Sequence, residues 1–121
     1  MGEYVPLYKP GQTITSQASA TITGGQLVAV SGVGTVGPAG AASTAVIGVA
    51  AFDVVNGDKL TIHVGGVQRL LPTSTVTAGD PVIAGAAGAI VTAAAPPLGQ
   101  QVGVALTTAT QPALAEVFMV R

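Results

Sequence analysis

The chain is 121 residues long, a length typical of a single domain. It carries four basic and five acidic side chains, so charged residues make up 7% of the chain and the net charge is -1. So few cations cannot follow a phosphate backbone, which excludes a nucleic-acid partner. The 49% apolar content argues against an intrinsically disordered chain. The absence of cysteine excludes disulfides, thiolate zinc sites and a cysteine nucleophile.

Small and β-branched residues dominate the apolar content. There are 17 glycines but only two Phe, two Tyr and no Trp. This composition favours thin, closely packed sheets over helices with bulky cores. Two long stretches, residues 10–52 and 81–115, carry no charged side chain. Because a free monomer normally keeps charge on its surface, we expect a homo-oligomer in which another subunit covers part of that surface.

Residues 1–19 are predicted to form an extended N-terminal arm, followed by a single β domain at residues 20–121. The segment has no helical periodicity and is too short to bury itself. Its aromatic and aliphatic side chains favour docking onto a partner, and the alternative is a frayed terminus in solvent. We expect no export signal, because a basic start followed by an apolar core is missing. The candidate contact residues of the arm are Tyr4, Val5, Leu7 and Tyr8.

Short strands separated by turns are predicted along the rest of the chain, which is typical of a small all-β barrel or sandwich. Apolar and polar residues alternate over residues 59–64, the pattern of a half-buried strand. Asn56-Gly57 precedes this strand and is predicted to form a hairpin turn with a strand inside residues 46–55. Further strands are predicted at residues 26–30, 33–37, 67–71, 81–84, 89–93, 99–107 and 113–120.

Residues 38–45 are predicted to hold a turn of helix, on alanine propensity alone.

The second apolar segment has two competing interpretations, a membrane span or buried strands. Residues 81–95 are strongly apolar, but a membrane span needs about 20 residues of apolar helix, and this stretch is shorter and contains Gly85 and Gly88. We therefore predict two buried strands joined by a glycine turn, and no membrane partner.

The chain also repeats itself. The sequence T-G-G-Q-L-V-A at residues 23–29 resembles T-A-G-D-P-V-I at residues 77–83. At nearly the same offset, I-G-V-A at residues 47–50 resembles V-G-V-A at residues 102–105. The shared order and spacing predict a duplicated β unit.

Few residues are candidates for chemistry. His63 is the only histidine, and a metal site needs three or four ligands, of which no cluster is present. Asp53 and Asp58 flank the Asn-Gly turn, where acids commonly bond to the backbone, and a functional carboxylate pair is the alternative. Residues 32–37 match G-x-G-x-x-G in letters, but Pro38 and a β-rich context follow where a phosphate-binding helix would begin. We predict no catalytic, cofactor-binding or metal-binding residue.

Five motifs follow one another along residues 10–121. They are T-G-G-Q-L-V-A-V, V-I-G-V-A-A-F-D-V, N-G-D-K-L-T-I-H-V-G-G-V-Q-R-L, T-A-G-D-P-V and Q-V-G-V-A-L. Their order resembles that of the tailed-phage capsid decoration proteins, or cement proteins, a family of small all-β proteins. The Ala- and Gly-rich stretch at residues 84–95 departs from the family's pattern.

The resemblance implies a location and a partner. Members of the family sit on the outer surface of the phage head, often as trimers, and clamp neighbouring major capsid proteins. A homotrimer made in the host cytoplasm and bound to the major capsid protein is therefore expected, with no catalytic residue to transfer. A low charge suits such a role, because contact faces without ions avoid the cost of burying unpaired charge. Two alternatives remain: a non-viral β-structural surface or adhesin module, and a subunit of a small enzyme.

Overall fold

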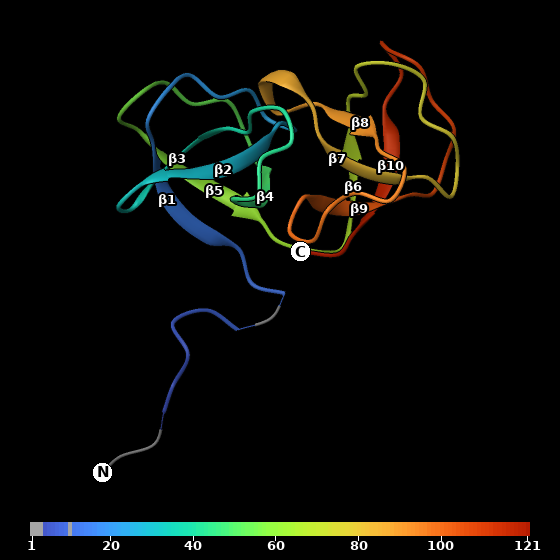
Figure 1. Ribbon diagram of the computed structural model, residues 1–121. Coiled ribbons are helices and arrows are strands. Elements are labelled where there is room, and N and C mark those ends of the chain that lie inside the picture. Colours follow the sequence, from blue (N-terminus) through green and yellow to red (C-terminus); the bar gives the residue numbers. More distant parts are fainter. Residues whose placement is uncertain (1–3, 10) are drawn as a thin grey trace.

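The computed structural model describes residues 4–9 and 11–121, and this part of the chain contains ten strands and one short 3-10 helix. The strands form two lobes, and the N-terminal segment leads away from them (Figure 1). The all-β prediction is confirmed. The first lobe contains β1 (Ile14–Ala18), β2 (Leu27–Gly32), β3 (Thr35–Pro38), β4 (Val46–Ala50) and β5 (Lys59–His63). The second contains β6 (Val67–Leu70), β7 (Pro81–Ala84), η1 (Ala86–Gly88), β8 (Ile90–Thr92), β9 (Gln101–Ala105) and β10 (Ala115–Met119).

The first lobe is a closed barrel with the strand order β1-β3-β2-β4-β5. Strand β1 closes the ring, because it pairs in parallel with β3, where Ala18 lies opposite Val36, and antiparallel with β5. Ile22, Leu60 and Ile62 are among the fully buried side chains of this lobe. A closed sheet leaves no free strand edge, so the barrel is protected against pairing with other chains.

The second lobe repeats this arrangement with the ring opened. Its strand order is β6-β10-β9-β7-β8. When β1 to β5 are replaced in turn by β6 to β10, the ring of the first lobe becomes β6-β8-β7-β9-β10, which is the same cyclic order read in the opposite direction. The terminal strands meet through a single parallel bridge between Pro72 and Ile90. These two residues occupy the positions of Ala18 and Val36, the pair at the closure of the first barrel. The strand topology therefore confirms the duplicated β unit.

The turn before β2 and the turn before β7 share their hydrogen bonds. In the first lobe the Thr23 N–H donates to Oε1 of Gln26 over 2.8 Å, and in the second the Thr77 N–H donates to Oδ2 of Asp80 over 3.0 Å. The glycine before each acceptor residue has a positive φ, +90° and +93°. The repeated T-x-G-[QD] motif thus forms the same turn twice, with different side chains as acceptors.

Gly48 and Gly103 allow neighbouring strands to approach closely. A Cβ atom at Gly48 would lie 2.4 Å from the carbonyl oxygen of His63 on β5. A Cβ atom at Gly103 would lie 2.4 Å from the carbonyl oxygen of Phe118 on β10. The close approach of the neighbouring strand therefore explains why the repeated G-V-A motif has glycine in both lobes.

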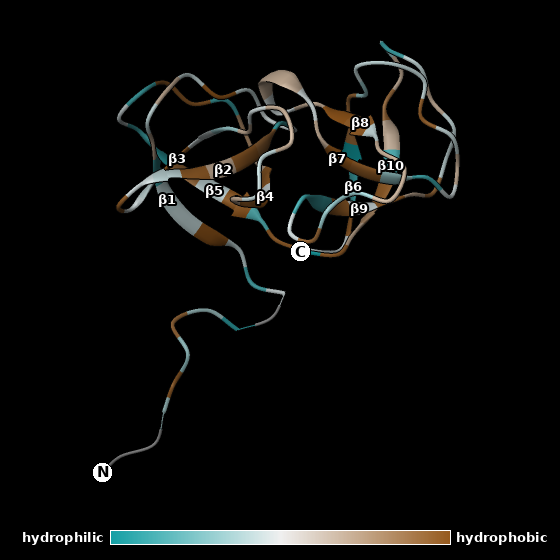
Figure 2. Cartoon of the chain, in the orientation of Figure 1, coloured by the Kyte–Doolittle hydropathy of each residue, from teal (hydrophilic) through white to brown (hydrophobic). Residues whose placement is uncertain are grey.

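The hydrophobic core extends across both lobes. Figure 2 shows hydrophobic stretches along strands on each side. One cluster of buried residues joins Leu27 and Val46 of the first lobe to Leu70, Val82 and Ile90 of the second. A further cluster fills the interior of the first barrel. Because the lobes share buried side chains, they pack as one body.

The helical turn predicted for residues 38–45 is wrong. After β3 the chain bends at Ala42, whose φ is +56°, and the Ala42 N–H donates to the carbonyl oxygen of Ala84 on β7 over 2.8 Å. A backbone hydrogen bond to the other lobe thus takes the place of a local helical one. Alanine propensity is a weak preference that such tertiary contacts override.

The predicted hairpin is correct in its pairing and wrong in its turn. Strands β4 and β5 are antiparallel neighbours, as expected. Val54, however, forms a separate bridge with Ile22, so β4 ends well before the Asn56-Gly57 pair. The two strands are joined by residues 51–58, and Asn56-Gly57 form a turn inside this longer connection.

The apolar stretch at residues 81–95 forms β7 and β8, which pair antiparallel as predicted and are joined through η1. Among the residues that the structure describes, no helix is both long and apolar enough to cross a membrane. Of the glycines in residues 32–37, which are predicted to be turn residues, only Gly34 lies in the turn between β2 and β3. Gly32 is the last residue of β2 and Gly37 lies in β3. The element that follows them is strand β4, not the helix that a phosphate-binding motif needs.

Candidate functional site

The N-terminal arm lies outside both lobes and ends at the barrel. Its described residues, 4–9, form neither strand nor helix and lead away from β1 (Figure 1). A turn follows, in which the Gln12 N–H donates to the Lys9 carbonyl over 3.1 Å and the Gln12 side chain accepts from the Lys9 N–H over 2.6 Å. Of the segment predicted as an arm, residues 14–18 form β1 of the barrel, and residues 1–3 and 10 lie outside the described residues.

The predicted contact residues of the arm are exposed. Tyr4 and Leu7 are 87% and 90% exposed, and Val5 is 72% exposed. Tyr8 is the least exposed, at 41%, and its hydroxyl accepts a long hydrogen bond of 3.4 Å from the Thr15 N–H of β1. Large apolar side chains are usually buried, and a group of exposed ones is typical of a contact surface.

His63 and the two acidic residues do not form a common site. Asp53 and Asp58 line one open hollow of about 260 Å³, and His63 does not line it. The Asp53 carboxylate accepts a hydrogen bond of 2.7 Å from the Gly24 N–H, which is the backbone role expected of an acid near a turn. His63 is exposed at the end of β5. Across residues 4–9 and 11–121, no three His, Cys, Asp or Glu side chains gather as a metal site requires.

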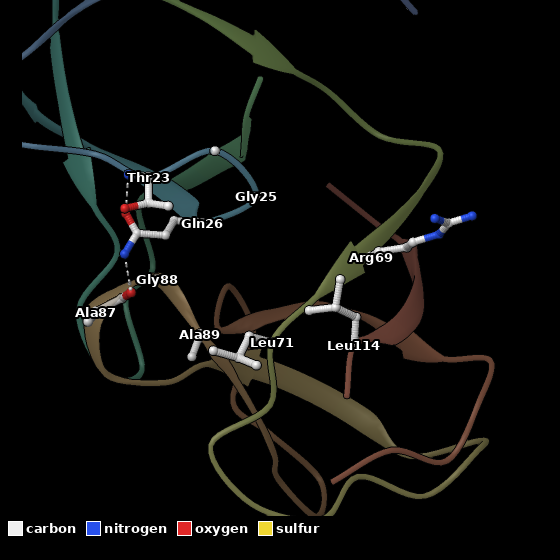
Figure 3. A pocket seen from close by; sticks show the side chains of 10 residues that line it. Thr23, Gly25, Gln26, Arg69, Leu71, Ala87, Gly88, Ala89 and Leu114 are labelled. Carbon is white, nitrogen blue, oxygen red and sulfur yellow. Dashed lines mark hydrogen bonds between the residues drawn. The ribbon is translucent and has the colours of Figure 1, made fainter. Parts of the chain in front are cut away.

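A groove of about 310 Å³ lies where the two lobes meet. Small residues form much of its lining, and Leu71 and Leu114 lie close together on one side of it (Figure 3). The Arg69 side chain points away from the turn that carries Gln26 (Figure 3). The lining residues are Thr23, Gly24, Gly25, Gln26, Arg69, Leu71, Ala87, Gly88, Ala89 and Leu114.

Gln26 and Gly88 hold the lobes together beside this groove. The Gln26 side-chain amide donates to the Ala87 carbonyl over 2.9 Å, a hydrogen bond drawn in Figure 3. A Cβ atom at Gly88 would lie 2.7 Å from Cβ of Gln26 and 2.9 Å from the Leu27 carbonyl oxygen. Sequence analysis missed both roles. The repeated turn motif contains Gln26, but its partner lies 61 residues away in the chain.

Comparison with known proteins relates this chain to a family of phage proteins. The family model described as phage cement protein matches residues 8–121, from the end of the arm to the last residue. The chain belongs to the phage cement protein family. It is thus a structural virion protein of a phage, which confirms the family identified from the motifs and replaces the alternative of a non-viral surface module.

The fold of this cement protein is similar to that of a phage head component. The crystal structure of the N base of the head fiber gp8.5 of bacteriophage phi29 superposes with a TM-score of 0.72. The alignment covers 89% of this chain and 92% of that chain, at 20% sequence identity. The two-lobed β architecture is therefore shared over nearly the full length of both. A search of the curated proteins returns no match.

Proposed function

We propose that this cement protein binds the outer surface of a phage capsid and stabilises the contacts between neighbouring major capsid protein subunits. The observation that carries the proposal is the arm: Tyr4, Val5 and Leu7 are all more than two-thirds exposed, and β1 fixes the arm to a closed barrel. A compact body with an extended arm can contact two subunits at once. Contacts that bridge subunits stabilise the assembled shell by mass action and need no chemistry.

The composition of the arm favours tight docking. Pro6 and Pro10 restrict the backbone to extended conformations, so the arm loses less conformational entropy when it binds. An extended segment can add a strand to the edge of a sheet in the partner. Tyr4 and Tyr8 are the tyrosines of the chain, and tyrosine is enriched among residues that dominate interface energies.

A trimer is the assembly we propose on the head. Closed cyclic symmetry lets one surface patch be buried once in every subunit. The low charge of the chain supports this, because 7% charged residues leave large uncharged surfaces that a partner can cover without burying ions. In this proposal the role is purely structural.

Removal of the arm tests the proposal. A protein lacking residues 2–11 keeps β1, which begins at Ile14, so we expect it to fold with the circular dichroism spectrum of the full chain. We expect its occupancy on undecorated heads to require at least a tenfold higher concentration, which corresponds to about 1.4 kcal/mol. Val33→Ala is the matched control, since Val33 is 104% exposed on the β2–β3 turn, outside the arm. Wild-type occupancy of the truncated protein across a dilution series would show that the arm does not bind.

A further inference from the structure

The outer face of the second lobe is unusually apolar. Strands β6, β10 and β9 are neighbours, and Val67 of β6 lies opposite Phe118 of β10. These two side chains are 53% and 52% exposed. Leu71 and Leu114 continue the same face beside the lobe groove, and Leu106 continues it just beyond β9. We name this surface, formed by Val67, Leu71, Leu106, Leu114 and Phe118, the β6–β10 face.

The first lobe provides an internal comparison for this face. In both lobes the face is built on the same strand positions, because the pairing of β1, β5 and β4 corresponds to that of β6, β10 and β9. The first-lobe equivalents of Leu71, Leu114 and Phe118 are Gln17, Lys59 and His63, in that order. All three equivalents are polar and exposed. The duplicated fold therefore accepts polar residues at these positions, and folding alone does not require the apolar ones.

One cation and one anion lie within the β6–β10 face. Arg69 stands directly opposite Glu116 in the β6–β10 pairing, whereas the corresponding first-lobe pair is Thr15 opposite Thr61. Both charged residues are exposed. The face is thus neutral as a whole, with its positive group on β6 and its negative group on β10. Two copies of such a face are complementary, since the cation of one copy can pair with the anion of the next.

We infer that the β6–β10 face packs against a second copy of this chain, with Arg69 of one copy paired to Glu116 of the next. The inference rests on the proposed homo-oligomer and names its contact surface. Phe118 lies beside the paired charges and supplies an aromatic anchor, as in interfaces whose energy is concentrated in a few residues. Leu71 and Leu114 extend the contact to the groove between the lobes.

The experiment is the mass of the full chain in solution, measured by light scattering over a concentration series. We expect the wild type to form an oligomer of the 11.7 kDa chain. The double variant Phe118→His, Leu114→Lys introduces the residue types of the first lobe, so it should keep its circular dichroism spectrum and run as a single chain. The control variant His63→Ala, Lys59→Ala changes the equivalent first-lobe positions and should keep the wild-type mass.

A charge exchange tests the identity of the partner. Arg69→Glu leaves two anions on the face and Glu116→Arg leaves two cations, because the two residues lie opposite each other in one chain. Each single variant should therefore self-associate at least tenfold more weakly, while an equimolar mixture of the two should associate again, since only contacts between chains then bring opposite charges together. A wild-type protein that stays a single chain, or a double variant with wild-type mass, would overturn the inference. A third result would also overturn it: the wild type stays a single chain in solution, and the double variant no longer occupies heads. The β6–β10 face would then bind the capsid and not a second copy. The arm-deleted protein should keep the oligomer mass, so failure of the proposed arm contact is distinguishable from failure of this one.

Discussion

At the scale of single residues, Gly48 and Gly103 link the sequence repeat to the packing of the strands. Each stands where a side chain would overlap the backbone of the adjacent strand, at 2.4 Å from a carbonyl oxygen. A flexible side chain can move aside, but a carbonyl oxygen in a paired strand cannot do so without loss of hydrogen bonds. The two positions are therefore specific for glycine in a way that most glycines of the chain are not.

We predict that Gly103→Ala lowers the free energy of unfolding by about 3 kcal/mol, the upper end of the range for overpacked cores. Gly40→Ala is the control, because a Cβ atom there meets nothing within 4 Å and its φ lies outside the left-handed region. Urea denaturation of both variants measures the difference. Equal midpoints for the two variants would contradict the packing argument.

His63, Asp53 and Asp58 are predicted to be dispensable for attachment. His63→Ala, Asp53→Asn and Asp58→Asn should each leave head occupancy within a few-fold of the wild type and stability within about 0.5 kcal/mol. Asn at position 53 keeps an oxygen that can accept the Gly24 N–H. Plaque formation by phage carrying each variant is the second measurement. Loss of viability with normal folding and occupancy would indicate chemistry at that residue.

At the scale of elements, the two lobes differ in how their rings end. In the first lobe β1 and β3 pair over two residue positions, whereas in the second β6 and β8 approach at the Pro72–Ile90 bridge alone. The first lobe also has a hydrogen bond of 3.2 Å from the Gln17 N–H to the Gly34 carbonyl, one residue before the Ala18–Val36 pair. The second lobe therefore keeps a partly open edge.

Hydrogen exchange tests this difference between the lobes. We predict that the amides of β8 exchange faster than those of β3, because an edge strand with few partners opens at lower free energy than a strand inside a closed ring. Native-state exchange read by mass spectrometry resolves the two segments. Equal protection of β3 and β8 would show that the opened ring is as stable as the closed one.

Much of the fold could be predicted from local pattern, and the failures occur where distant contacts decide. Residues 59–64 and 81–84 show clear strand patterns, and both form strands at nearly the predicted bounds. Strand β1, inside the segment predicted as an arm, has one large apolar residue, Ile14, and is a strand because β3 and β5 pair with it. The exposed arm residues could be proposed from composition. The β6–β10 face could not, because it depends on the register between strands far apart in the sequence.

At the scale of the whole molecule, the two lobes form one body that carries two proposed contact surfaces, the N-terminal arm and the β6–β10 face. The shared core fixes the lobes relative to each other, the arm leads away from β1, and the β6–β10 face lies on the second lobe. Because the arm leads away from the first lobe and the β6–β10 face lies on the second, one copy can contact the capsid and a neighbouring copy together. We predict that images of decorated heads show three copies around a symmetry axis. Isolated copies that touch no other copy would contradict the proposed trimer.

Heating of heads that lack the protein, with the protein added at increasing concentration, tests the proposed stabilisation of the shell most directly. A ligand that binds the assembled shell and not its separated subunits raises the temperature of disruption as its free concentration increases. We therefore predict a disruption temperature that rises with added protein until all sites are occupied, and a curve for the arm-deleted protein displaced to at least tenfold higher concentration. A disruption temperature that stays at the value of bare heads while the sites are fully occupied would contradict the proposed function.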